Sequence, residues 1–69
     1  MDKKSRNKLY DAGFVFYRAH FDFLKSEGQI TYSDTPGSWK KHSSGFKSKA
    51  STLKALEAIR DEDPKALID

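Results

Sequence analysis

The sequence predicts a small α+β domain, with an all-α domain of three helices and an ordered loop as the alternative. Three observations lead to this prediction. Apolar residues recur at helical spacing over residues 9–24 and again over residues 46–59, and an alternating segment with a turn motif lies between them. The 69 residues are expected to form one domain, with residues 1–4 frayed.

The first helix is expected to be long and aromatic, running from Ser5 to Ser26, with Ser5 as its N-cap and Gly28 as its C-terminal stop. Two adjacent apolar stripes define it: Leu9, Gly13, Phe16, His20 and Phe23, then Tyr10, Phe14, Tyr17, Phe21 and Leu24. A strand is disfavoured because it would present aromatic residues on both faces. Burial of both faces is expected to exceed what so short a chain can supply.

The apolar arc of this predicted helix is wider than a surface helix requires. It covers roughly 220°, about twice the stripe of an ordinary surface helix. Phe16 and Phe23 lie near its centre and are expected to be buried. Tyr10 and Phe14 lie at one margin, so one of the two is expected to stay substantially exposed. If the protein is a protein-binding module, this residue is expected to contact the partner.

The middle of the chain predicts a short β-hairpin. Gln29–Ser33 and Ser38–Ser43 are its strands, Trp39 points inward, and Asp34–Gly37 supplies Pro and Gly for the turn.

Two further helical segments are expected after the hairpin. The second helix presents a narrow aliphatic seam, begins at Ser48 or Ser51 as N-cap, and ends near Arg60. Its seam consists of Phe46, Ala50, Leu53, Leu56 and Ile59. Asp63 followed by Pro64 predicts a last helical turn from Pro64 to Ile68.

Composition argues against several classes of function. The chain has no cysteine, which excludes disulfides and thiolate metal sites. His20 and His42 lack further ligands at metal-binding spacing, and the carboxylates of Asp61–Asp63 form no convincing catalytic pair. We therefore expect neither an enzyme nor a cofactor. No apolar run approaches the ~20 residues of a membrane span, and no signal peptide is recognisable, so a cytoplasmic protein is expected.

Charge is segregated along the chain and favours nucleic acid as a partner. Residues 1–8 carry a net charge of +3 and residues 38–54 carry +5 without any acidic residue, whereas residues 55–69 carry −3. Lysines interleaved with aromatic and hydroxyl residues are typical of phosphate binding. The candidate nucleic-acid-binding residues are Lys40, Lys41, His42, Lys47, Lys49, Lys54, Trp39, Lys3, Lys4 and Arg6. The choice between DNA and RNA stays open.

The alternative function is a small protein-binding module or inhibitor that docks on a larger enzyme or complex. Its surface would be the aromatic and charged face that contains Tyr10 and Phe14. The acidic block at residues 55–69 supports this alternative, because it repels a polyanion. The sequence specifies neither the target nor the oligomeric state.

The segment GFKSKA, from Gly45 to Ala50, precedes a predicted helix and resembles the end of the small arm-binding domain of tyrosine integrases. That family places three strands upstream, where this sequence predicts one long helix. The resemblance covers only this segment, and no residue role is carried over from it.

Overall fold

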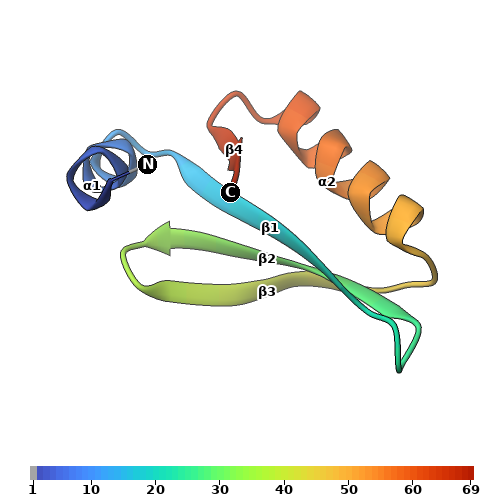
Figure 1. Ribbon diagram of the computed structural model, residues 1–69. Coiled ribbons are helices and arrows are strands. Elements are labelled where there is room, and N and C mark those ends of the chain that lie inside the picture. Colours follow the sequence, from blue (N-terminus) through green and yellow to red (C-terminus); the bar gives the residue numbers. More distant parts are fainter. Residues whose placement is uncertain (1) are drawn as a thin grey trace.

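The computed structural model describes residues 2–69 and is an α+β domain of two helices and a four-stranded mixed sheet (Figure 1). The strand order is β3-β2-β1-β4, with an antiparallel meander β1-β2-β3 and with β4 parallel to β1. The elements are α1 (Lys3–Asp11), β1 (Val15–Asp22), β2 (Glu27–Thr35), β3 (Ser38–Phe46), α2 (Lys49–Glu62) and β4 (Ala66–Ile68). The predicted α+β class is confirmed, and the all-α alternative is wrong. Of the residues expected to be frayed, Met1 lies outside the described residues, and α1 already begins at Lys3.

The predicted long helix from Ser5 to Ser26 is wrong, because the chain leaves the helix at Gly13. Gly13 has φ +89°, a left-handed conformation that favours glycine. The Phe14 amide donates to the Leu9 carbonyl, and the Gly13 amide donates to the Tyr10 carbonyl, both at 3.0 Å. These two bonds form a Schellman motif that ends α1 and directs the chain into β1. The N-cap is Asp2, whose carboxylate accepts the Ser5 amide at 2.7 Å.

Strand β1 is aromatic on both sides because a helix lies on each side of it. Its start is covered by α1, where the Tyr10 and Phe16 ring centres are 5.1 Å apart and Phe16 is only 3% exposed. The opposite face lies under α2 (Figure 1). Phe21 of β1 and Thr52 of α2 line a small pocket there. Two short helices thus provide the two-sided burial that was judged too demanding for this chain.

The main core lies between α2 and the sheet. Ile30 is fully buried there, with Thr52, Leu56 and Ala66 nearly so. Gly28, predicted to stop the first helix, is instead a buried residue of β2 that α2 crosses at Thr52. No buried side-chain nitrogen or oxygen in residues 2–69 lacks a hydrogen-bond partner.

The predicted hairpin is confirmed, and its strands are longer than expected. Pro36 and Gly37 form the turn, with Gly37 at φ +75° as the third residue of a type II turn requires. Three strands therefore precede α2, where the sequence predicted a helix and a hairpin.

The second helix is also confirmed, with Ser48 as N-cap. Ser48 and Ser51 form a reciprocal capping box. The helix ends at Glu62 rather than near Arg60. The predicted seam is only partly right, because Phe46 belongs to β3 and both Ala50 and Leu53 are exposed.

The predicted helical turn from Pro64 to Ile68 is wrong. The Asp63 carboxylate accepts the Lys65 amide at 2.9 Å and closes a tight turn instead of capping a helix. The chain then forms β4, and the Lys65 carbonyl accepts the Val15 amide at 2.9 Å. The apolar Ala66–Ile68 segment completes the sheet because β1 offers a free edge there.

The exposed aromatic surface is not where the sequence placed it. Phe23 was expected to be buried and is 73% exposed, beside Leu24 at 98%, in the β1–β2 turn. Tyr10 and Phe14 are both half-buried. Neither helix of residues 2–69 is long and apolar enough to cross a membrane.

Candidate nucleic-acid interface

Helix α2 covers one face of the meander, and neither helix covers the centre of the opposite face. The strand register places Arg18 opposite Thr31 and His20 opposite Gln29 on this second face. Thr31 in turn pairs with Lys41, and Gln29 with Ser44. We call the resulting surface the open face; it consists of Arg18, His20, Gln29, Thr31, Lys41 and Ser44.

Helix α1 covers one end of the same face and places a second arginine there. The Tyr10 hydroxyl lies 2.7 Å from Ser33 Oγ, and the Arg6 guanidinium lies 4.0 Å from the centre of the Phe16 ring. The Arg18 guanidinium lies 4.1 Å from the Trp39 ring. The border of the open face therefore consists of aromatic rings, and the guanidinium groups of Arg6 and Arg18 stack on them.

Both arginines bind the carboxylate of Asp69. Arg6 Nη1 donates to Oδ1 at 2.8 Å, and Arg18 Nη2 donates to Oδ2 at 2.6 Å. These hydrogen bonds, first from Arg6 and then from Arg18, hold the pKa of Asp69 below its ordinary value. The Asp69 carboxylate likewise raises the pKa of the Arg6 guanidinium. Arg6 and Asp69 are therefore both charged at neutral pH.

The lowered pKa of Asp69 predicts a specific loss of stability in acid. A carboxylate with a lowered folded-state pKa stabilises the fold above its ordinary pKa of 3.8. This contribution is lost as the pH falls through the folded value. Thermal unfolding measured between about pH 2 and pH 6 should therefore depend less steeply on pH in Asp69→Asn than in the wild type.

Asp61→Asn is the matched control for this prediction. It removes the same charge from an exposed pair with Arg60, at 3.5 Å, and should keep the acid limb of the wild-type profile. Asp2, whose pKa is lowered by the Ser5 amide, leaves a residual slope in both variants. Equal slopes in Asp69→Asn and Asp61→Asn would contradict the assignment to Asp69.

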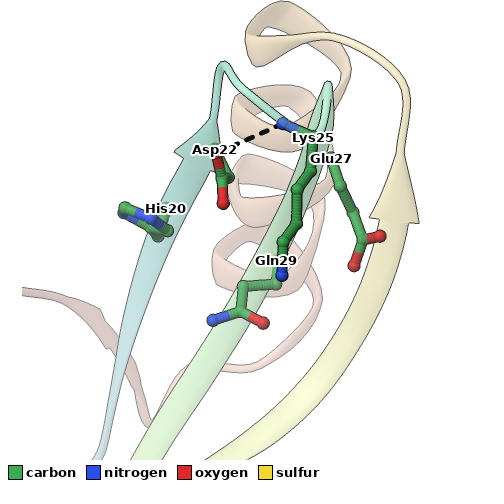
Figure 2. Close-up of a pocket in the computed structure, with 5 residues that line it drawn as sticks. All are labelled: His20, Asp22, Lys25, Glu27 and Gln29. Carbon is green, nitrogen blue, oxygen red and sulfur yellow. Dashed lines mark hydrogen bonds between the residues drawn. The ribbon is translucent and has the colours of Figure 1, made fainter.

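The other end of the open face is a shallow, acidic hollow of about 210 Å³ (Figure 2). His20 and Gln29 lie beside Asp22 and Glu27 here, with Lys25 from the β1–β2 turn. The Asp22 carboxylate accepts the Leu24 and Lys25 amides at 3.0 and 3.3 Å, which fixes the turn. No group of three or more histidine, aspartate or glutamate side chains in residues 2–69 is placed to hold a metal ion.

The structure does not bring the predicted nucleic-acid-binding residues together. Lys41 lies on the open face, with Trp39 and Arg6 at its border. Lys40 and His42 point to the opposite face, since Lys40 pairs with Tyr32 and the His42 ring centre lies 5.7 Å from that of Tyr17. The remaining predicted residues are exposed elsewhere: Lys3 and Lys4 on α1, Lys47 in the bend before α2, and Lys49 and Lys54 on α2.

Two residues of the open face were missed because they were assigned to a helix. Arg18 was placed on the polar side of that helix, and His20 at the margin of its apolar face. Polar residues alternate with apolar ones over residues 17–22, and this period of two is the signal that could have revealed a strand with one open side.

Comparison with known proteins adds no assignment: no protein-family model matches the chain, and neither the curated proteins nor the solved structures give a significant match.

Proposed function

We propose that this protein is a small, non-enzymatic nucleic-acid-binding protein whose open face contacts double-stranded DNA. The supporting observation is a three-stranded sheet surface, uncovered by the helices of the described chain, that carries basic and hydrogen-bonding side chains. A sheet face that no helix covers contacts either solvent or a ligand. The basic and hydrogen-bonding side chains of the open face favour contact with a ligand.

The chemistry of the open face suits a polyanion with readable edges. Arg18 and Lys41 supply positive charge, and Arg6 adds to it at the border. Arginine and lysine bind phosphate, and arginine, glutamine and hydroxyl side chains also bind base edges. The net charge of +3 and the isoelectric point near 9.3 act in the same direction.

Duplex DNA fits this surface better than the other nucleic acids. The major groove of B-form DNA admits β-strands, and several sheet proteins bind DNA with them. The major groove of A-form RNA is too narrow for side chains to read. Binding of single strands relies on exposed aromatic rings, whereas Trp39 is half-buried and stacked under Arg18.

The acidic hollow limits the part of the open face on which DNA can bind. Asp22 and Glu27 pair across β1 and β2 at the turn end, where they repel phosphates. The DNA backbone is therefore expected to cross the centre of the open face and the border with α1.

Lys41→Ala is expected to weaken DNA binding several-fold and to reduce the salt slope by about one. Lys40→Ala is the matched control, because Lys40 is the adjacent exposed residue of β3 on the opposite face. Fluorescence anisotropy with a labelled duplex at several salt concentrations measures both quantities. Equal losses in the two variants would contradict binding through the open face. Absence of salt-sensitive binding to duplex DNA, single-stranded DNA and RNA would remove the proposal itself.

A second candidate function is a protein-binding module or inhibitor, and the β1–β2 turn favours it. Phe23 and Leu24 are adjacent residues of this turn and are 73% and 98% exposed. Apolar side chains of this kind form the centres of protein interfaces. Protein capture from a lysate that survives nuclease treatment, and that Phe23→Ser with Leu24→Ser abolishes, would support this function over DNA binding.

A further inference from the structure

Arg6 and Arg18 form a two-pronged site around a single carboxylate, which we call the arginine clamp. Arg6 binds one oxygen of Asp69 and Arg18 binds the other, at 2.8 and 2.6 Å. Each guanidinium also lies against an aromatic ring, Arg6 on Phe16 at 4.0 Å and Arg18 on Trp39 at 4.1 Å. The rings hold the two cations in place, so the clamp is preorganised for an anion with two oxygens.

We infer that the arginine clamp is a phosphate-binding site and that the Asp69 carboxylate occupies it as an internal competitor, which a phosphate group displaces. The guanidinium fork binds carboxylate and phosphate with the same geometry. A phosphodiester presents two non-bridging oxygens where Asp69 presents its two carboxylate oxygens. With Asp69 bound, two cations face one anion, and the clamp retains a positive charge that attracts phosphate.

The position of the clamp supports a role in binding rather than in stability alone. One arginine suffices to neutralise one carboxylate, yet Arg18 reaches Asp69 from the open face while its side chain stays 52% exposed. The side chains of Arg6 and Asp69 are 25% and 23% exposed. Arg18 therefore is the member of the clamp that an incoming ligand reaches first.

Displacement of Asp69 requires only a rotation of its side chain. The Asp69 amide donates to the Tyr17 carbonyl at 2.8 Å, so the backbone stays attached to β1 when the carboxylate leaves. Tyr10 and Phe16 continue to hold Arg6 and α1. The clamp can therefore exchange one anion for another without opening the fold.

This inference deepens the proposed function, since it names the point where a DNA phosphate binds, but its test does not depend on DNA. Trp39 is the only tryptophan of the chain, and its fluorescence reports the Arg18 that stacks on it. Inorganic phosphate is titrated at constant ionic strength into wild type, Asp69→Asn and Asp61→Asn. Asp61→Asn carries the same charge change away from the clamp, in the pair with Arg60.

We expect Asp69→Asn to bind inorganic phosphate about tenfold more tightly than the wild type, the order of effect of one removed charge-assisted contact. Asp61→Asn should bind like the wild type. Adding Arg18→Ala to Asp69→Asn should abolish the gain, and Arg18→Lys should restore only part of it, because lysine lacks the fork. Equal phosphate affinity in Asp69→Asn and Asp61→Asn overturns the inference.

A separate control covers the case in which the Asp69→Asn variant does not fold. If Asp69→Asn lacks the wild-type melting transition, side-chain NMR of the wild type decides. Phosphate must then shift the Arg6 and Arg18 Nε signals more than that of Arg60, and equal or absent shifts overturn the inference. Phosphate binding by Asp69→Asn without DNA binding by the wild type would remove the proposed function alone. DNA binding that is identical in Asp69→Asn and Asp61→Asn, without any gain in phosphate affinity, would remove this inference alone.

Discussion

Replacing Phe16 with alanine is expected to unfold most of the protein at room temperature. Phe16 is 3% exposed and joins α1 to the sheet, with the Tyr10 ring at 5.1 Å and the Arg6 guanidinium at 4.0 Å. Truncation of a buried phenylalanine costs about 3–5 kcal/mol. The whole stability of a small domain is of the order of 5 kcal/mol, so little would remain. Far-UV circular dichroism and thermal melting measure the loss.

Phe23→Ala is the matched control for Phe16→Ala. The same atoms are removed from a side chain that is 73% exposed, and the free energy of unfolding should change by less than about 0.5 kcal/mol. The helix prediction for residues 9–24 and the structure differ most clearly at these two positions. In the predicted long helix both phenylalanines lie near the centre of the apolar arc, whereas in the structure only Phe16 is buried. Equal destabilisation by the two substitutions would contradict the fold.

Gly28→Ala is expected to shift α2 away from the sheet and so to lower the free energy of unfolding. An added Cβ at Gly28 would lie 1.9 Å from Thr52 Oγ1, 3.0 Å from Thr52 Cβ and 3.1 Å from Phe21 Cδ2. Thr52 is fixed by its hydroxyl, which donates to the Ser48 carbonyl at 2.8 Å. Relief therefore requires a backbone shift, and overpacking of this kind costs about 1–3 kcal/mol or more. Urea unfolding measures the cost.

A double-mutant cycle with Thr52→Ala identifies the clash as the cause. Thr52→Ala removes Oγ1 but keeps the Cβ atom, so it should relieve part of the clash. The double variant should then be more stable than the sum of the two single changes predicts. Strict additivity would show that Gly28→Ala destabilises the protein through something other than contact with Thr52.

Local signals predicted the parts of the fold that depend on neighbouring residues. The Pro36–Gly37 turn was identified, and the N-cap Ser48 was one of the two candidates, because backbone conformation and capping are decided within three or four residues. Residues 9–24 satisfy a helical period and, in part, a strand period. The choice between them depends on two helices that cover β1 from opposite sides, and no local pattern reports that arrangement. Gly13 was the local signal that was misinterpreted, because it was counted in an apolar stripe of the predicted helix although it ends α1.

The candidate site was only partly predictable for a related reason. Lys40 and Lys41 are equivalent in composition, and only the pairing of β3 with β2 separates them onto opposite faces. A register shift between Ile30 and Thr31 also places Ser44 on the same face as Lys41, three residues away. Simple alternation along β3 would assign Ser44 to the wrong side. The clamp partner Asp69 is more than sixty residues from Arg6, so their contact follows from β4, which was predicted as helix.

The irregular pairing of β3 also determines how separate copies of this chain behave toward one another. β3 forms one edge of the sheet, and its unpaired backbone groups could extend into a second molecule. Its pairing with β2 is interrupted by register shifts, Gly45 stands at φ +88°, and Lys40 and Lys41 are charged. A twisted, bulged and charged edge cannot align with another copy over a long stretch, and β4 shields part of the opposite edge. The irregular pairing that places Lys41 and Ser44 on the open face thus also resists the edge-to-edge stacking from which aggregates grow.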